Sequence, residues 1–271
     1  MIFFKLQDFF YKSYLSSIFT SLFGFFVNVS FPKGIQRFLQ YLFVSTLKIK
    51  NIDQVYPTLQ DCFTRPGSVS DNESEYILSP VEALVQSTGQ VEMGKVLQAK
   101  GVSYSLSHLL PSDLFISFID SYYMTLYLSP SDCHRIYAPI TGSIHSVHHI
   151  SGYMRPVREP WLSNQNAVYT QNERVMLHIE NDKFDMIMVM VAAFNVGLID
   201  LTFKPFRFKS KKHGDYQNQI FSKPISMKQG QHLATFLLGS TVIIFAREKN
   251  HLPSNPFMLT HSVKTAIGDR L

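Results

Sequence analysis

The hydrophobic and polar positions of this chain follow two different periods, one before and one after about residue 77. Within the first 48 residues, apolar side chains recur every three or four positions, which is the spacing of one face of an α-helix. One such run covers residues 15–29 and a second covers residues 35–47, with Pro32 and Gly34 between them. The pattern predicts two amphipathic helices in the N-terminal quarter of the chain.

The first of these runs lies in a stretch without charge, between Lys12 and Lys33, and an uncharged stretch of this length suggests a transmembrane helix. Small and polar side chains nevertheless gather on its second face: Ser16, Ser17, Thr20, Ser21, Gly24 and Asn28. We therefore predict a pair of helices that lie in the membrane interface, with packing in a protein core and a true membrane span as the alternatives. No small-residue cleavage site follows the run, so a secretory signal peptide is not expected.

From about Ile77 onward the apolar positions alternate, as in β-strands. Half-buried strands are predicted at residues 123–128, 174–179, 198–203 and 242–245. Residues 186–194 are apolar almost throughout, which predicts a strand buried on both faces. Turn residues separate these segments at 129–132, 141–142, 151–152 and 229–230. The predicted fold class is α+β, with amphipathic N-terminal helices followed by a β-rich core.

The composition indicates a binding partner and a cellular compartment. The 271 residues, 45% of them hydrophobic, suit one globular domain with a membrane-seeking end. A net charge of +5 suits an anionic lipid surface, although charge alone would equally suit nucleic acid. Cys62 and Cys133 are the only cysteines, so no disulfide framework is expected and a reducing compartment is favoured.

The candidate chemistry centres on the tetrapeptide Leu238-Gly239-Ser240-Thr241, which runs directly into an apolar stretch. A serine hydroxyl can attack the carbonyl before it and convert that amide into an ester, if a base takes its proton and the backbone can bend. Glycine makes the bend easy. Elimination and hydrolysis would then leave a pyruvoyl group at position 240. This ketone can condense with a primary amine and accept the electron pair that is released as CO2 leaves, as pyridoxal phosphate does elsewhere.

Further segments accompany this tetrapeptide in a fixed order: residues 97–101, 104–106, 109–110, 127–130, 134–135 and 172–175. Together, from about Phe63 to Ala246, they resemble the phosphatidylserine decarboxylase family. The resemblance implies a membrane enzyme that cuts itself between Gly239 and Ser240 and uses the resulting pyruvoyl group as its cofactor. It further implies a barrel-like catalytic core over residues 63–271, a helical membrane-associating region over residues 1–62, phosphatidylserine as substrate, and the cleaved subunit as a partner.

The family relay of aspartate, histidine and serine is only partly matched. Glu82 stands at the aspartate position and Tyr137 at the position of the triad histidine, whereas the preceding family histidine is kept as His134 and Ser240 is intact. The predicted catalytic residues are therefore Ser240, His134, Glu82 and Tyr137. A tyrosine, with an ordinary pKa near 10, cannot easily act as a general base. Ser240 then needs another activator, and His134 is the nearest in sequence; the resemblance gives His134 a role in decarboxylation.

Two functions stay open on the sequence. One is the self-cleaving decarboxylase, and the other is a non-processing relative, catalytically impaired, that acts as a membrane lipid-binding protein. In the second case Glu82 is a carboxylate at a surface turn, and His134 and Tyr137 are structural. Either protein is expected at the cytoplasmic face of a membrane as a peripheral protein, and a homodimer is left open.

Other groupings are weaker. His145, His148 and His149 do not predict a metal site, because adjacent strand residues point to opposite faces and no further ligand has suitable spacing. The basic and aromatic residues of segment 206–214 fit a solvated loop or a contact with anionic headgroups, and no nucleic-acid partner is expected. Gly197 corresponds to a backbone feature near the family's pyruvoyl site.

Overall fold

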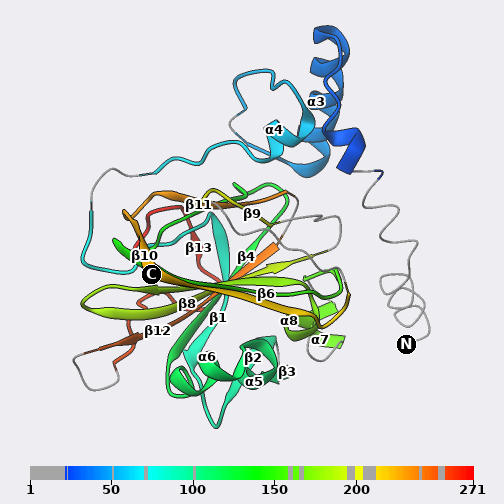
Figure 1. Cartoon of the computed structure of the whole chain (residues 1–271). Coiled ribbons are helices and arrows are strands. Elements are labelled where there is room, and N and C mark those ends of the chain that lie inside the picture. The colour runs from blue at the N-terminus through cyan, green and yellow to red at the C-terminus, as the bar shows by residue number, and fades with distance from the viewer. Residues whose placement is uncertain are drawn as a thin grey trace.

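A computed structural model describes Leu22 and residues 24–50, 52–69, 73–99, 102–157, 161–164, 168–193, 199–203, 212–237, 240–249 and 254–271. More of these residues belong to β-strands than to helices, and the helices around the strands are mostly short (Figure 1). The predicted α+β class is therefore confirmed, with the strands in the majority.

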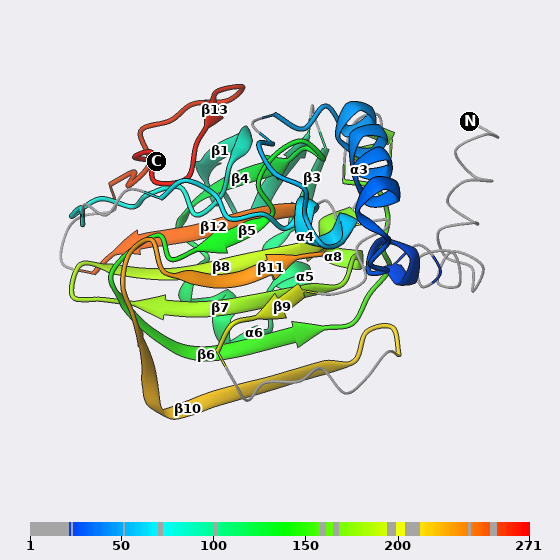
Figure 2. The same ribbon diagram turned by 90° about the horizontal axis from the view of Figure 1, so that it is seen from above.

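An eight-stranded antiparallel sheet forms the centre of the molecule, in the order β10-β6-β7-β8-β12-β4-β1-β13 (Figure 2). Its strands are β1 (Ala83–Gln90), β4 (Tyr122–Leu128), β6 (Gly142–Ile150), β7 (Arg174–Glu180), β8 (Phe184–Ala192), β10 (Tyr216–Met227), β12 (Ser240–Glu248) and β13 (Lys264–Thr265). The prediction of a barrel-like core is wrong for the described strands, because the edge strands β10 and β13 do not pair with each other. With only two residues, β13 offers too few backbone groups to close a barrel.

Both faces of this sheet are covered (Figure 1). On one face lies a three-stranded sheet of β5 (Arg135–Tyr137), β11 (His232–Phe236) and β9 (Ile199–Leu201). On the other lie α5 (Leu106–Leu109), α6 (Ser112–Ser117) and the hairpin of β2 (Lys95–Ala99) and β3 (Val102–Ser105), with α7 (Trp161–Asn164) and α8 (Val168–Gln171) beside them.

This double covering explains the apolar central strands. All nine residues of β8 are buried, which confirms the strand predicted to be buried on both faces as far as the structure describes it. Residues 242–245 are also fully buried, and residues 123–128 and 174–179 are buried except for Tyr127 and His178, so the prediction of half-buried strands is wrong for all three segments. The apolar residues 242–245 of β12 do not alternate with polar ones. Both faces of β12 are buried because this strand lies between β8 and β4 in the centre of the sheet.

The N-terminal part contributes α3 (Lys33–Leu47) and α4 (Leu59–Phe63), on the side of the sheet that carries β11 and β9 (Figure 1). The first predicted helix falls largely outside the described residues. On α3 the buried side chains are polar, with Gln36 2% and Gln40 5% exposed, whereas Phe38 is 60% exposed. The apolar stripe of α3 is therefore divided: Ile35, Phe38 and Leu42 are exposed, whereas Phe43 and Leu47 pack against the core. None of the described helices has the length and hydropathy that a membrane crossing requires.

Candidate functional site

Ser240 is the first residue of β12, at one end of the central sheet. Its backbone pairs with Leu128 and Ala192, which are the last residues of β4 and β8. Gly239, the other residue of the predicted cleavage site, lies outside the described residues, as does Leu238. Just before them, the Leu237 carbonyl accepts a 2.7 Å hydrogen bond from Nε2 of Gln60 in α4. The chain is thus held in place on both sides of the predicted cleavage point.

His134 lies beside this segment. Its carbonyl accepts a hydrogen bond from the Phe236 N–H at 2.9 Å, so the residue is joined to β11. Ser240 follows Phe236 by four residues, a stretch that spans at most about 14 Å when extended. The imidazole is fully buried, and its centroid lies 4.0 Å from that of the Phe63 ring of α4.

The tautomer of His134 follows from its one hydrogen bond. Nδ1 lies 2.8 Å from the Asp132 carbonyl, which can only accept, so Nδ1 carries the proton in the neutral ring. Nε2 is then an unprotonated nitrogen, and it is buried without a hydrogen-bond partner in the described structure. An unpartnered buried nitrogen of this kind is available to accept a proton.

The burial of His134 makes acid stability a test of this geometry. Desolvation lowers its pKa from 6.5 to about 4, so the unfolded chain binds the extra proton first. Stability contributed by neutral His134 is therefore present above pH 6.5 and is lost as the pH falls towards 4, by at most about 1.4 kcal/mol per pH unit. Urea unfolding of the wild type and of His134→Asn across this range should show a steeper loss in the wild type. Parallel curves would contradict the buried neutral ring.

Glu82 contacts the backbone before His134 instead of its ring. Its Oε2 accepts a hydrogen bond from the Cys133 N–H at 3.1 Å, and its Oε1 lies 3.7 Å from Nζ of Lys264. The side chain is 36% exposed. Because Nδ1 of His134 is bonded to a main-chain carbonyl, no carboxylate–imidazole pair forms between Glu82 and His134. Glu82 thus fixes the loop that carries His134.

The contacts of Tyr137 indicate a structural role. Its hydroxyl accepts a 2.9 Å hydrogen bond from the Gly67 N–H, and its ring lies beside His232, with centroids 5.6 Å apart. Burial raises the pKa of Tyr137 further above its ordinary value, so the phenol stays protonated at neutral pH. The structure brings Glu82, His134 and Tyr137 together around Cys133. Neither Glu82 nor Tyr137 is placed to act as the free base that Ser240 requires.

Sequence reasoning missed the residues that shape the His134 loop. Asp132, which is buried, accepts hydrogen bonds from the Ser129 N–H at 2.8 Å and the Ser129 hydroxyl at 2.9 Å. Lys264 donates to the other carboxylate oxygen at 2.7 Å, and this hydrogen bond raises the Lys264 pKa. From the opposite side, Arg65 donates to the Ser131 carbonyl at 2.8 Å. The Ser-Pro-Ser-Asp turn was a visible signal for Asp132, whereas nothing local marks Lys264 or Arg65.

A separate cluster of potential metal ligands lies at the far end of the sheet. His178 Nε2 is 2.8 Å from Asp185 and 3.2 Å from Glu180. Each carboxylate is already paired with a cation, since Arg247 lies 2.6 Å from Asp185 and Lys249 lies 2.6 Å from Glu180. Arg247 is seven residues along β12 from Ser240, or about 23 Å away. This charge-balanced cluster stands apart from the candidate site.

The rings of His148 and His149 have separate hydrogen-bond partners. Nε2 of His148 lies 2.7 Å from the Ser146 hydroxyl and Nδ1 lies 2.6 Å from the Tyr216 hydroxyl, while His149 lies 3.2 Å from Glu173. These rings therefore do not converge on one point. Gly197 and most of the basic segment 206–214 fall outside the described residues.

Comparison with known proteins places this chain in a family. Residues 61–271 match the family model described as phosphatidylserine decarboxylase. A phosphatidylserine decarboxylase proenzyme of Legionella pneumophila (strain Lens) is 33% identical over 242 residues, which cover 83% of each chain. The corresponding proenzyme of Alcanivorax borkumensis is 32% identical over 76% of this chain and 72% of its own, and that of Brevibacillus brevis is 31% identical over 81% and 80%.

These matches show that the protein is a decarboxylase. The chain belongs to the phosphatidylserine decarboxylase family. The relatives are named as proenzymes, and the matched region contains Ser240, His134, Glu82 and Tyr137.

Proposed function

We propose that this protein is made as a proenzyme, cuts itself between Gly239 and Ser240, and decarboxylates phosphatidylserine to phosphatidylethanolamine at a membrane surface. In this proposal residues 1–62 associate with the membrane and residues 63–271 form the catalytic domain. The observation that carries the proposal is the free Nε2 of buried His134, joined through β11 to the segment that leads into Ser240, within a region that matches the family.

Self-cleavage would begin with removal of the Ser240 hydroxyl proton by Nε2 of His134. The oxygen then attacks the Gly239 carbonyl carbon, and the C–N bond breaks to give an ester and a free amine. Loss of the Cα proton of residue 240 expels the Gly239 carboxylate. Addition of water to the remaining unsaturated residue releases ammonia and leaves the pyruvoyl group on residues 240–271.

The residues around position 240 fit such a group. When present, it would supply the ketone that binds the substrate amine and takes up the electron pair of the breaking bond to the carboxylate. Backbone pairing of β12 with β4 and β8 would hold position 240 in place. His134, no longer needed for cleavage, keeps a buried nitrogen that can carry a proton to or from the substrate.

The cleaved fragment would remain bound as a subunit. β12 pairs with β8 from Ser240 to Glu248 and with β4 from Ser240 to Ala246, and β13 pairs with β1. Breaking one peptide bond at the end of the sheet leaves all these pairs intact. We therefore expect the two chains to separate only under denaturing conditions.

The test of the proposed function is the mass of the purified protein after denaturation. A fragment of residues 240–271 that begins with a pyruvoyl group would support it. An intact chain without decarboxylase activity would instead support the non-processing, lipid-binding relative. That alternative is favoured by one observation, the engagement of the Tyr137 hydroxyl with Gly67 where the family has its triad histidine.

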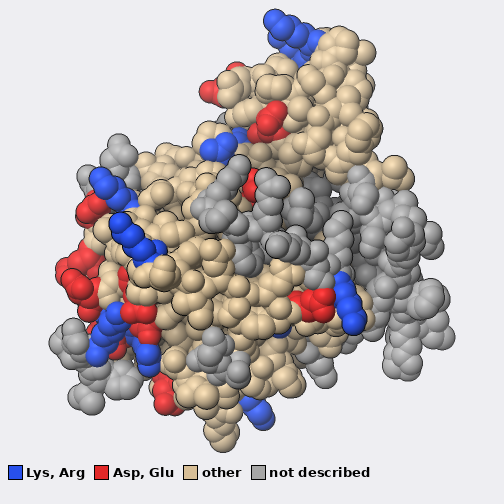
Figure 3. Space-filling model, viewed as in Figure 1, with Lys and Arg blue, Asp and Glu red and all other residues tan. Residues whose placement is uncertain are grey.

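Membrane association is proposed from the exposed apolar side chains of α3 and of the residues before it. Phe25 is 74% exposed and Phe38 is 60% exposed. Figure 3 shows that residues other than Lys, Arg, Asp and Glu make up most of the surface over α3, with a basic group at its outer end. An apolar surface with basic groups beside it suits the interface of an anionic membrane. Buried, unpaired Cys62 and Cys133 agree with the proposed cytoplasmic face.

The double substitution Phe25→Glu and Phe38→Glu should release the protein from liposomes, because both side chains would otherwise be buried among lipid groups. High salt alone should release the wild type only partly, since apolar insertion is not screened. Cosedimentation with liposomes measures both effects. Ile220→Glu, which changes a side chain 71% exposed on β10, is the matched control and should stay bound. Complete release of the wild type by salt would contradict the proposal.

A further inference from the structure

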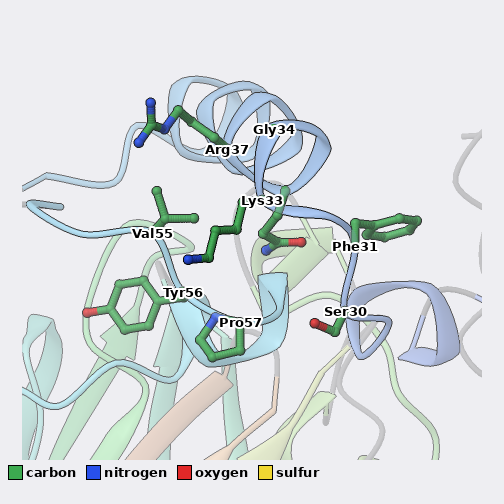
Figure 4. Close-up of a pocket in the computed structure, with 9 residues that line it drawn as sticks. Ser30, Phe31, Lys33, Gly34, Arg37, Val55, Tyr56 and Pro57 are labelled. Carbon is green, nitrogen blue, oxygen red and sulfur yellow. The ribbon is translucent and has the colours of Figure 1, made fainter.

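A cavity of about 720 Å³ lies between the first turn of α3 and residues 55–57, away from the Ser240 site (Figure 4). Its walls include Phe31, Lys33, Gln36, Arg37, Tyr56 and Pro57. In Figure 4 the Lys33 side chain extends from α3 towards Tyr56 and Pro57, which face the helix across the cavity. None of the acidic residues that the structure describes lines it.

Two glutamines on the same face of α3 differ in the hydrogen bonds of their side-chain amides. Gln40 is fully used, because its Nε2 donates to the Gln54 carbonyl at 2.7 Å and its Oε1 accepts from the Tyr56 N–H at 2.8 Å. Gln36, one turn earlier, is 2% exposed and lines the cavity, yet neither Nε2 nor Oε1 has a hydrogen-bond partner in the described structure. Buried amides almost always have partners, so Gln36 lacks one that a ligand could supply.

The start of α3 adds positive potential at the same place. The Gln36 N–H is the first to bond within the helix, to the Pro32 carbonyl at 2.9 Å, so the N–H groups of the three preceding helical residues have no partner inside the helix. No side chain caps this end, and no acidic residue occupies the first turn. Lys33 and Arg37 line the cavity beside it. Helix N-termini with such surroundings bind anions.

We propose that this cavity binds the phosphate of an anionic phospholipid headgroup. Lys33, Arg37 and the free N–H groups of the first turn of α3 would neutralise the phosphate, and the Gln36 amide would hydrogen-bond to the headgroup. The site is distinct from the one at Ser240 and would hold a lipid that is bound and not converted. It rests on the membrane association proposed above.

A lipid is favoured over a free phosphate because of what surrounds the cavity. Phe31 and Tyr56 form part of its wall, and Ile35 and Phe38, on the same helix, are 52% and 60% exposed. A soluble anion would leave these side chains in water, whereas a lipid would place its acyl chains beside them. The cation and amide groups at one end and the apolar groups outside therefore match an amphipathic ligand.

The test uses the full-length protein with vesicles of phosphatidylcholine alone or with phosphatidylglycerol, which cannot serve as a substrate. Gln36→Leu keeps the net charge and removes only the unpartnered amide. It should weaken binding to the anionic vesicles by about tenfold, the range of a hydrogen bond to a charged group, without changing binding to phosphatidylcholine. Its melting temperature should not fall, because no internal hydrogen bond is lost. Cosedimentation and thermal unfolding give the two readouts.

Charge-matched variants separate a site from general attraction. The double change Lys33→Gln and Arg37→Gln should weaken anionic binding by about fivefold for each residue, and more than the double change Lys48→Gln and Lys50→Gln at the other end of α3. Equal losses in the two pairs, or wild-type binding by Gln36→Leu, would overturn the proposal. Thermal stabilisation by inorganic phosphate equal to that by soluble dihexanoyl phosphatidylglycerol would overturn the lipid assignment. None of these readouts requires cleavage or decarboxylation, so they stand even if the proposed activity fails.

Discussion

Ser240→Ala is expected to remain a single uncut chain of 271 residues with no decarboxylase activity. The substitution removes the hydroxyl that must attack the Gly239 carbonyl, and with it the precursor of the pyruvoyl group. Both losses should be complete, because the attacking atom and the cofactor come from the same side chain. Intact mass under denaturing conditions and release of CO2 from phosphatidylserine measure the two effects.

Ser131→Ala is the matched control for this experiment. Its hydroxyl lies 2.8 Å from the Ser129 hydroxyl in the loop that leads to His134, so it alters the same region without touching the cleavage point. It should be cut and should retain activity. If the wild type and Ser240→Ala both ran as the same uncut chain, the self-cleaving enzyme would be ruled out and the non-processing relative would remain.

The fold was predictable where the pattern depends on one segment alone. The apolar run of β8 identified a doubly buried strand because no exposed face interrupts it. The open edge of the sheet was not predictable, since it depends on whether β10 and β13 meet in space. Helix α3 shows the same limit. Its periodicity gives two faces, but the contacts of Gln40 with residues 54–56 and of Phe43 with Phe63 decide which side chains of each face are buried.

The candidate site was predictable to the extent that it lies in short motifs. Ser240 and His134 were selected because the residues around each one match the family in order. Their surroundings were not, because the contacts join distant parts of the chain: Gln60 reaches Leu237, and Lys264 reaches Asp132. The substituted positions show why motif position does not fix a role. Glu82 keeps a carboxylate but directs it to the Cys133 N–H, and the Tyr137 hydroxyl accepts a hydrogen bond from the Gly67 N–H.

His134→Asn is expected to slow self-cleavage by about 10²- to 10⁴-fold, the usual contribution of a positioned acid–base group. The asparagine amide can still donate to the Asp132 carbonyl, as Nδ1 does now, but it has no basic nitrogen in place of Nε2. The loss should therefore reflect the missing base and not a displaced loop. The rate at which the fragment of residues 240–271 forms during cell-free synthesis measures it.

Tyr137→His decides whether His134 acts alone. If His134 is the base, a second histidine should bring no gain and should do harm, because the substitution removes the phenol that accepts the Gly67 N–H bond. If the chain instead has an impaired form of the family relay, Tyr137→His should speed cleavage relative to the wild type. The same substitution should also restore cleavage to the His134→Asn variant. Rapid cleavage by His134→Asn itself would reject His134 as the base. Neither account of the base would then explain how Ser240 is activated, because the Glu82 carboxylate contacts the Cys133 N–H.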